Sequence, residues 1–273
     1  MLCQEMESQK SVSPDQKCKK LLHAILTESL VKTVFQPIYS LENRSILGFE
    51  ALSRGPKNSL LEKPLELFSC AESYNCLSDL ELLCRRQAIS QFSQLQLPGL
   101  LFLNVSPNTL LDPKHPHGQT LHLLNAANIS VDRVVVEITE GQRIRDVELF
   151  QKAIHHYREL GFQIAIDDLG SGYSCLRQWS ELQPDIVKID RYFIDSCHQQ
   201  TGKTTFLKAI VALAKATDTR VVAEGIEKPE ELQLLQQLGI DMAQGFLLAK
   251  PKTKPGLEPI SRMLLDKVRV DSK

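Results

Sequence analysis

Apolar and polar positions along the chain repeat with two different periods, one typical of helices and one typical of strands. Runs with apolar residues three or four positions apart predict helices, and they occupy residues 17–32, 64–74, 79–95, 119–128, 147–160, 174–182, 203–217, 229–238 and 258–268. Short runs rich in Val, Ile, Leu and Phe predict strands. There are eight of these runs, at residues 34–41, 45–54, 100–106, 133–139, 162–168, 185–190, 220–226 and 241–249.

The order of these elements predicts how the sheet is built. Only the tripeptide "ENR" at residues 42–44 separates the first two strands, which is typical of an antiparallel hairpin. After the hairpin, helices and strands alternate, and this alternation predicts parallel strands covered by helices. Eight strands in one chain favour a closed barrel over an open sheet. The predicted fold is therefore α/β, a modified (β/α)₈ TIM-type barrel with an antiparallel first strand.

One folded unit is expected to follow a short tail. Residues 1–18 are polar and aperiodic, so we expect them to form a flexible N-terminal tail. Residues 19–273 contain no linker rich in Gly, Ser and Pro and are assigned to the barrel. The 273 residues are 42% hydrophobic and 24% charged, a composition that suits one large core.

The charge balance bears on the class of partner. A formal net charge of -1 argues against a protein that binds nucleic-acid polymers or anionic membranes, because both need an excess of Lys and Arg. No run of about 18 apolar residues predicts a membrane span. The first residues, "MLCQEMESQK", lack the apolar segment of a signal peptide, so we expect a cytoplasmic protein.

The seven cysteines are scattered along the chain and are never spaced as CxxC. This spacing does not suit a zinc site or a disulfide framework. We expect reduced thiols, most of them small side chains of the core.

Polar side chains lie at the ends of the predicted strands, where an apolar core would not place them. They are Glu50, Asn104, Glu137, Asp167, Asp168, Lys188, Asp190, Glu224 and Gln244. In a parallel barrel the C-terminal ends of all strands meet at one mouth, which is where barrel enzymes keep their chemistry. We therefore expect these side chains to converge.

Several carboxylates that converge in a pocket of low dielectric need cations, or some of them must be protonated. The available donors are carboxylate and amide oxygens, and such hard donors select Mg²⁺ or Mn²⁺ over Zn²⁺. Two ions suit the adjacent pair Asp167 and Asp168: a bend at Gly170 and Gly172 would let Asp167 bridge both ions while Asp168 binds the second.

Other interpretations of the same residues stay open at this point. An acid at a strand end before Gly is often a helix N-cap or an Asx-turn. Arg54 and Lys188 are also compatible with plain salt bridges to the acids. The barrel architecture alone admits an aldolase or enolase-like enzyme that uses Lys188 as a Schiff base or proton acceptor.

With these residues identified, the sequence resembles the EAL-domain family of cyclic di-GMP phosphodiesterases. The resemblance runs from about Val31 to Pro251. It is carried by ordered motifs, "FQPI" (35–38), "GFEALSR" (48–54), "LNVS" (103–106), "VEITE" (136–140), "DDLGSGYS" (167–174), "VKID" (187–190), "AEGIE" (223–227) and "QGF…KP" (244–251).

The resemblance implies a modified barrel that uses two Mg²⁺ or Mn²⁺ ions to hydrolyse cyclic di-GMP to linear pGpG, which lowers the second-messenger level in bacterial signalling. It implies first-metal ligands at Glu50, Asn104, Glu137 and Asp167. It implies second-metal ligands at Asp167, Asp168 and Glu224.

The resemblance also implies roles around the metals. Lys188 corresponds to the lysine beside the attacking water, Glu140 to the acid that steadies the loop after the aspartate pair, and Glu227 and Gln244 to groups that orient water or the ligands. The nucleotide would be lined by Gln36, Leu52, Arg54, Asp190 and Pro251.

Two residues depart from the commonest form of the family. Leu169 and Ser171 stand where the loop after the aspartate pair most often has Phe and Thr, which bears on turnover and on dimer coupling. The resemblance further implies a homodimer and fused or separate sensor, CBS or GGDEF domains. A receptor that binds cyclic di-GMP with negligible turnover is the main alternative, although no metal position is lost.

Overall fold

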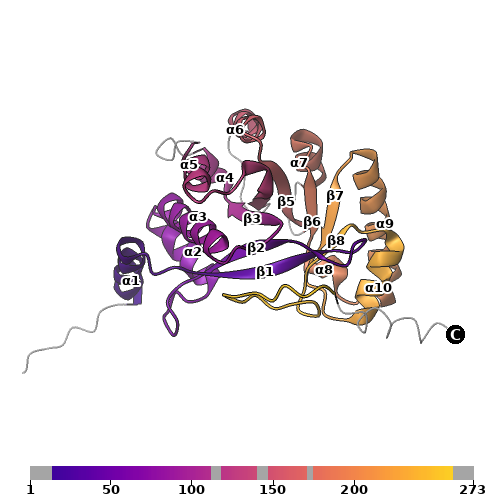
Figure 1. Cartoon of the computed structure of the whole chain (residues 1–273), viewed down its shortest axis with the longest axis horizontal. Helices are drawn as coiled ribbons and strands as arrows, with labels where there is room; N and C mark the ends of the chain where they lie inside the picture. The colour runs from indigo at the N-terminus through magenta and orange to yellow at the C-terminus, as the bar shows by residue number, and fades with distance from the viewer. Residues whose placement is uncertain (1–13, 112–117, 140–146, 171–174, 261–273) are drawn as a thin grey trace, which may run out of the picture.

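A closed ring of eight strands forms the centre of the computed structural model, which describes residues 14–111, 118–139, 147–170 and 175–260. The strands follow one another around the ring in chain order (Figure 1). They are β1 (Lys32–Ser40), β2 (Ile46–Arg54), β3 (Leu100–Val105), β4 (Val134–Thr139), β5 (Gln163–Leu169), β6 (Ile186–Ile189), β7 (Arg220–Ala223) and β8 (Met242–Ala243). The predicted barrel is confirmed.

Strand β1 is the only strand of the described ring that runs against its neighbours. It pairs antiparallel with β2, where Gln36 lies opposite Glu50, and antiparallel with β8, where Tyr39 lies opposite Ala243. The pairings from β2 through β8 are all parallel. The expected hairpin at the start of the barrel is therefore confirmed, and the hairpin also closes the ring.

The last strand is shorter than its sequence pattern predicts. Residues 241–249 were expected to form one strand, but only Met242–Ala243 pair in β8. The chain then turns, because the backbone N–H groups of Leu248 and Ala249 both donate to the carbonyl of Gly245. An apolar run of this length does not distinguish a strand from a buried turn.

Helices cover the outside of the ring (Figure 1). They are α1 (Pro14–Glu28), α2 (Pro64–Ser73), α3 (Leu77–Gln94), α4 (Pro107–Leu110), α5 (Gln119–Ala126), α6 (Val147–Glu159), α7 (Cys175–Leu182), α8 (Arg191–Ile194), α9 (Thr201–Ala216) and α10 (Pro229–Leu238), with 3-10 turns at Val131–Arg133 and Cys197–Gln199. The one-turn helices α4 and α8 were not predicted, since four residues carry no periodicity.

The ends of the chain bear on the assigned boundaries. Helix α1 begins at Pro14, inside the segment 1–18 that was expected to be a tail. The rest of that tail, and most of the helix expected at 258–268, lie outside the described residues. Among the described residues, no helix combines the length and the apolar character that crossing a membrane requires.

The inside of the ring is filled by one layer of mostly apolar side chains. These side chains are Ile38, Phe102, Val135, Ala165, Ile186, Val222 and Met242. Because side chains on a strand alternate between faces, the residue two positions further along also points inward. On the parallel strands β3–β8 that residue is polar in every case: Asn104, Glu137, Asp167, Lys188, Glu224 and Gln244.

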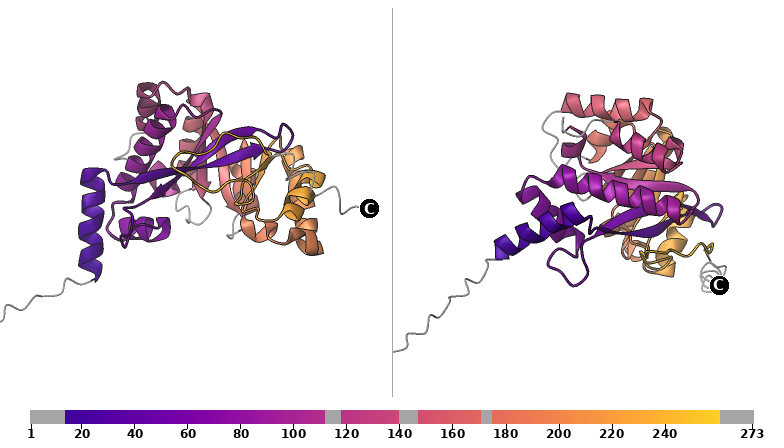
Figure 2. Two further views of the ribbon diagram at one scale, coloured as in Figure 1. Left: turned by 60° about the horizontal axis from the view of Figure 1, so that its bottom comes forward. Right: turned by 60° about the vertical axis from the view of Figure 1, so that its left-hand side comes forward.

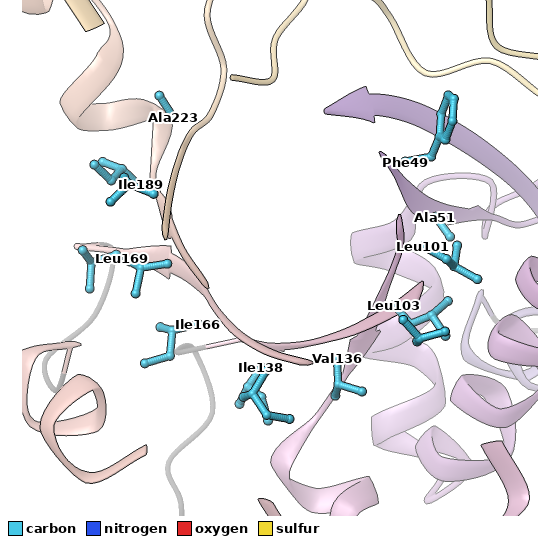
Figure 3. Close-up of a cluster of buried hydrophobic side chains, with 14 of the residues drawn as sticks. Phe49, Ala51, Leu101, Leu103, Val136, Ile138, Ile166, Leu169, Ile189 and Ala223 are labelled. Atoms are coloured by element: carbon cyan, nitrogen blue, oxygen red, sulfur yellow. The ribbon is translucent and has the colours of Figure 1, made fainter. Parts of the chain in front are cut away.

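The outward-facing side chains form the larger core. In Figure 3, Phe49, Leu101, Val136, Ile166 and Ile189 point away from the space that the strands enclose and toward the helices. All five are at most 1% exposed. The packing of this layer holds the strands in register and so fixes the height of the polar layer inside the ring.

A smaller core lies at one side of the barrel, where α1 packs against α2 and α3 (Figure 2). In this core Cys18 of α1 is joined to Cys70 of α2 by a disulfide. The expectation of reduced thiols is therefore wrong for this pair, because helix packing brings together two cysteines that are 52 positions apart in the sequence. The described cysteines Cys76, Cys84 and Cys197 are free.

Candidate metal centre

The polar layer forms a charged cluster around one lysine. Lys188 Nζ lies 2.8 Å from oxygens of Glu137, Asp167 and Glu224, and 3.4 Å from Glu50 Oε2. These residues come from five different strands or strand ends, so the cluster exists only because the ring closes. The convergence expected from the strand ends is confirmed for these side chains.

Two amide side chains donate hydrogen bonds to the two carboxylate oxygens of Glu50. Asn104 Nδ2 donates to Glu50 Oε1 at 3.2 Å, and Gln244 Nε2 donates to Glu50 Oε2 at 2.7 Å. Glu50 is only 6% exposed, so these bonds replace water around its carboxylate. The oxygen of the Asn104 amide is left to act as an acceptor or metal ligand.

The backbone bends at the aspartate pair itself. Asp168 has a φ of +56°, and the pairing of β5 with β6 shifts in register between Ile166 and Leu169. A strand sends consecutive side chains to opposite faces, but this left-handed residue breaks the alternation. Both carboxylates therefore face the mouth. The sequence argument placed the bend at Gly170 and Gly172; it begins at Asp168, while Gly172 lies outside the described residues.

Burial makes the cluster hard to ionise. Burial raises the pKa of Glu137 and of Glu224 well above the usual value, and neighbouring carboxylates act in the same direction against the opposing charge of Lys188. Burial, followed by the charge of Asp167, raises the pKa of Asp168 to about 6. Burial lowers the pKa of Lys188, but the surrounding carboxylates outweigh burial and raise it well above its usual value.

Two groups of carboxylates are close enough to share a cation. Oxygens of Glu50, Glu137 and Asp167 lie within 4.8 Å of one another, and so do oxygens of Asp167, Asp168 and Glu224. Asp167 belongs to both groups. Within the described residues, the buried Glu137 Oε2 accepts no hydrogen bond, so this oxygen has room for a further cation.

The donors therefore fit divalent metal ions. Five carboxylates against one ammonium leave four negative charges when all are ionised, which two divalent cations would neutralise. All donors are carboxylate or amide oxygens, as Mg²⁺ and Mn²⁺ prefer. The absence of His and Cys from these groups, among the described residues, disfavours Zn²⁺.

A cavity of about 610 Å³ opens onto this cluster. Glu50, Asn104, Asp167 and Asp168 form one polar part of its wall. The sequence-predicted residues Leu52 and Arg54 line it as well, at the end of β2. Burial lowers the pKa of Arg54, and the charge of Glu50 opposes this change.

Other residues expected to line the nucleotide have structural partners. Gln36 Nε2 donates to the Ala249 carbonyl at 3.1 Å, which ties β1 to the segment before Pro251. Asp190 caps α8, since its Oδ1 accepts the Tyr192 N–H at 2.8 Å. The N-cap interpretation thus describes Asp190 but not the cluster. Pro251 is half-buried.

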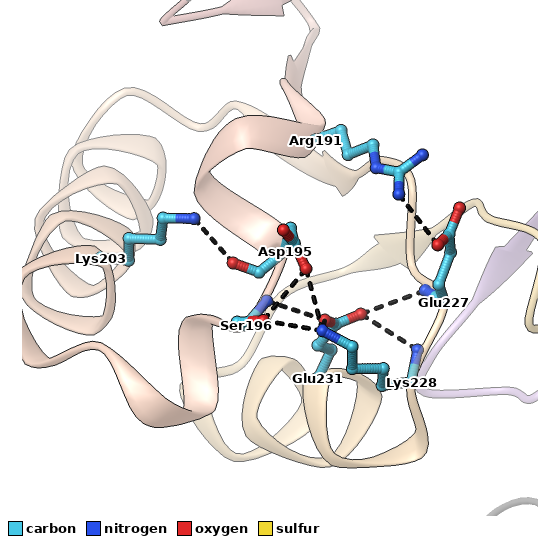
Figure 4. A network of polar contacts seen from close by, with 7 residues as sticks. All are labelled: Arg191, Asp195, Ser196, Lys203, Glu227, Lys228 and Glu231. Atoms are coloured by element: carbon cyan, nitrogen blue, oxygen red, sulfur yellow. Dashed lines mark hydrogen bonds and ion pairs between the residues drawn. The ribbon is translucent and has the colours of Figure 1, made fainter.

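Glu227 lies in a separate polar network (Figure 4). Its carboxylate pairs with Arg191 at 2.9 Å, and its backbone N–H donates to Glu231. The buried Glu231 also accepts the N–H of Ser196, so it ties the segment after Glu224 to the end of α8. The structure does not join Glu227 to the cluster. Glu140 lies outside the described residues, as does Ser171.

Two residues of the cavity wall were missed by the sequence argument. Glu81 and Arg85 lie one turn apart on α3, are 7% and 4% exposed, and line the cavity. The sequence feature that could have identified them is a Glu and an Arg four positions apart within the helical run 79–95. Such pairs are most often on exposed helix faces, so this feature does not indicate a cavity.

Comparison with known proteins agrees with this geometry. Residues 19–251 match the family model described as the EAL domain. The chain is 33% identical over 226 residues to the probable cyclic di-GMP phosphodiesterase PdeI of Escherichia coli K12, covering 80% of this chain and 28% of that protein. It is 32% identical over 216 residues to the cyclic di-GMP phosphodiesterase PdeR of the same organism, covering 76% and 32%. The chain thus spans about a third of the length of these curated relatives.

Solved structures have the same fold. A standalone versatile EAL protein from Vibrio cholerae O395, in its c-di-GMP bound form, superposes with a TM-score of 0.77 at 29% identity, covering 86% of this chain and 97% of that one. BlrP1 of Klebsiella pneumoniae, in a calcium and cyclic di-GMP complex, superposes with a TM-score of 0.75 at 31% identity, covering 82% and 56%.

Proposed function

The chain belongs to the EAL domain family, and from this membership we propose that it is a metal-dependent phosphodiesterase that hydrolyses cyclic di-GMP to linear pGpG. The observation that carries the proposal is the pair of carboxylate groups that share Asp167 at the mouth of the barrel. Such an arrangement suits two cations held close together, as in two-metal hydrolysis of phosphodiesters. In a cell this activity would lower the level of the second messenger.

The proposed ligands follow from the two groups. Glu50, Asn104, Glu137 and Asp167 would hold one Mg²⁺ or Mn²⁺ ion, and Asp167, Asp168 and Glu224 would hold the other. Such ions would supply positive charge that polarises the phosphate and lowers the pKa of a bound water.

Residues of the chain supply the remaining chemistry. Lys188 is protonated and buried among the carboxylates, from where its N–H groups would orient the attacking water. Arg54 lies at the cavity wall. It would bind either the phosphate that is not cleaved or the leaving oxygen of the phosphate that is cleaved. Gln244 would hold Glu50 in its ligand orientation through the 2.7 Å hydrogen bond.

The nucleotide would lie in the cavity of about 610 Å³ next to Leu52 and Arg54. We also propose that three further residues line the nucleotide, because their motifs resemble those of the family: Gln36, Asp190 and Pro251. Glu140 is proposed to steady the loop after the aspartate pair. Glu227, whose carboxylate pairs with Arg191 at 2.9 Å, is proposed to orient water or the ligands.

The geometry argues against the two rival functions. A Schiff base requires a neutral amine, and the carboxylates around Lys188 keep it protonated. A receptor without turnover is not favoured, because the described residues retain the carboxylates of both groups.

The oligomeric state and the regulatory partners of the chain are proposed from its family and from the length of its relatives. We propose that the chain acts as a homodimer and that sensor, CBS or GGDEF domains regulate it, either fused or separate, since its relatives are about three times longer. A cytoplasmic location accords with the proposed substrate.

Incubation with cyclic di-GMP in Mg²⁺, Mn²⁺ or Ca²⁺, followed by chromatography, tests the function. We expect pGpG with Mg²⁺ or Mn²⁺, none after EDTA treatment, and none from Asp167→Asn, which removes the shared carboxylate. Failure of the wild-type protein to produce pGpG under all three ions, while it binds cyclic di-GMP, would instead establish the receptor.

A further inference from the structure

Arg85 is a buried cation away from the metal ligands. It lies on α3 and is only 4% exposed. Its ion-pair partner among the described residues is Glu81, whose Oε2 lies 3.7 Å from Arg85 Nη1. A buried guanidinium is costly unless its charge and its N–H groups are both satisfied.

The pair with Glu81 leaves donors of Arg85 unused. Among the described residues, Nε and Nη1 of Arg85 have no hydrogen-bond acceptor. Glu81 Oε2 also accepts the backbone N–H of Ser106 at 3.2 Å, so it is shared with the end of β3. By contrast, the exposed Arg177 binds Glu181 at 2.7 Å. The protein therefore buries Arg85 without supplying the acceptors that a folded interior normally provides.

Arg85 faces the same cavity as the metal ligands. The cavity wall includes Arg85 and Glu81 and, next to them on α3, the small or apolar residues Leu77, Cys84 and Ala88. The carboxylates form a different part of the wall, at the strand ends. A ligand that fills this cavity could thus place a phosphate at the carboxylates and a planar apolar group, with acceptor atoms on its edge, at α3.

We propose that Arg85 is a specificity-determining residue that binds the N7 and O6 atoms of one guanine base of the substrate. The assignment rests on the proposed function, which supplies a ligand with two guanines. A guanidinium donates two parallel hydrogen bonds to N7 and O6 of guanine, whereas adenine presents a donor in place of O6. Small apolar neighbours suit the faces of a base.

The position of Arg54 favours the base over the phosphate as the partner of Arg85. Arg54 lies at the end of β2, the strand that carries Glu50, so it lies on the side of the cavity where the phosphate must meet the cations. Arg85 interacts with Glu81 on the helix instead.

Equilibrium binding measured by calorimetry tests the assignment. The probes are cyclic di-GMP, its analogue with 7-deazaguanine bases, which lacks the N7 acceptor, and cyclic di-AMP. Binding is measured with Ca²⁺, and chromatography of each sample confirms that no product has formed. The variants are Arg85→Gln and the double variant Glu81→Gln with Arg85→Met, which avoids leaving Glu81 unpaired. Arg86→Met is the matched control, since Arg86 is the neighbouring but exposed arginine.

We expect the wild-type protein to bind cyclic di-GMP about 10-fold or more tightly than the 7-deaza analogue and than cyclic di-AMP, because a bidentate arginine contact carries discrimination of this size. Both Arg85 variants should lose that preference, and Arg86→Met should keep it. Equal wild-type affinity for cyclic di-GMP and the 7-deaza analogue overturns the assignment without the need for a folded variant.

The remaining outcomes separate this assignment from the proposed function. If the variants weaken binding of all three probes by one common factor, Arg85 binds phosphate and not the base, and the assignment is wrong. If they bind cyclic di-GMP like the wild type, Arg85 has no part in recognition, while the proposed function stands. If the wild-type protein binds no cyclic di-GMP, the proposed function fails, and the role of Arg85 fails with it.

Discussion

Lys188 and Glu137 form an ion pair from which water is excluded. Nζ lies 2.8 Å from Oε1, and the two side chains are 1% and 0% exposed. Two charges buried in this way are stable only when each is paired, because desolvation costs several kcal/mol per ion. The positive charge of Lys188 in this pair therefore offsets part of the negative charge of the candidate metal site.

Replacement of the lysine should therefore destabilise the metal-free protein. We expect Lys188→Met to lower the free energy of unfolding by about 3–5 kcal/mol, since breaking a buried pair leaves an uncompensated charge. Urea denaturation in EDTA measures this change. Lys152→Met is the control, because Lys152 pairs with Glu148 at 2.8 Å but 68% of its side chain is exposed; there we expect no comparable loss.

The same variant should respond more strongly to divalent cations. Mg²⁺ adds positive charge to the cluster, so it should recover part of the stability that Lys188→Met loses. Turnover should not recover, because the proposed N–H donors to the attacking water are gone. An equal loss of stability in Lys188→Met and Lys152→Met would show that the buried cluster is not charged in the folded protein.

Removal of Glu50 should abolish turnover. Both of its oxygens are held by amides, from Asn104 and Gln244, so the orientation of this proposed ligand is fixed. We expect Glu50→Ala to lower kcat by more than about 100-fold, which exceeds the usual loss for groups that only support a ligand. Product formation at saturating Mn²⁺ measures the effect, with the exposed Glu148→Ala as control. Near-normal turnover by Glu50→Ala would remove Glu50 from the ligand set.

The stability of the metal-free protein should fall as the pH rises from about 4 to about 6. Burial and Asp167 raise the pKa of Asp168 from its usual value of 3.8 to about 6. In this window the unfolded chain has released the proton and the folded protein still holds it, so the free energy of unfolding decreases with pH. Asp168→Asn removes this titration and should make the decrease in EDTA less steep between pH 4 and pH 6, while the raised pKa values of Glu137 and Glu224 still contribute a decrease.

Metal ions should reverse that trend. Ligand carboxylates must be deprotonated to bind a cation, so Mg²⁺ should raise the melting temperature more at pH 8 than at pH 5. Thermal melts at both pH values, with and without Mg²⁺, measure the difference. An equal shift at both pH values would mean that Mg²⁺ does not bind these carboxylates.

Gly170 should not tolerate a side chain. Its φ is +103°, and an added Cβ would lie 2.1 Å from Cε2 of Phe193. We expect Gly170→Ala to cost about 1–3 kcal/mol of stability and to lower turnover, since Asp168 is two residues away. Denaturation and product assays measure the two effects.

The matched control for this substitution is Gly202→Ala in the first turn of α9. No described atom lies within 4 Å of a Cβ at that position. Ala is a better helix former than Gly, so this change should be neutral or stabilise by up to about 1 kcal/mol. Similar effects of the two substitutions would indicate that Phe193 moves freely away from Gly170.

Much of this site could be predicted because it is encoded locally. An apolar residue followed two positions later by a polar one, as in Val135 and Glu137 or Ile186 and Lys188, places both side chains on the same face of a strand. Alternation of helices and strands then indicates a parallel barrel, whose strand ends meet. These steps need no distances between remote residues. Leu169 is an exception to this alternation, because the left-handed residue Asp168 lets its buried side chain pack in the outer core with Ile166.

Other features depended on which remote elements come to lie together. The left-handed turn at Asp168, the pair of Glu227 with Arg191, and the disulfide between Cys18 and Cys70 join segments or conformations that no local pattern specifies. Arg85 belongs to the same group, because only the packing of α3 against the strand ends turns it toward the cavity.

The sequence by itself determined the order of the elements, the closed barrel and the carboxylates of the polar layer, because strand periodicity and the direction of parallel strands are local properties. Only the tertiary structure decided that Lys188 lies at the centre of the carboxylates and that the Asp190 carboxylate caps α8. The physical reason is that charge and hydrogen bonding depend on distances of a few ångströms between side chains, and these distances are set by barrel closure and strand register.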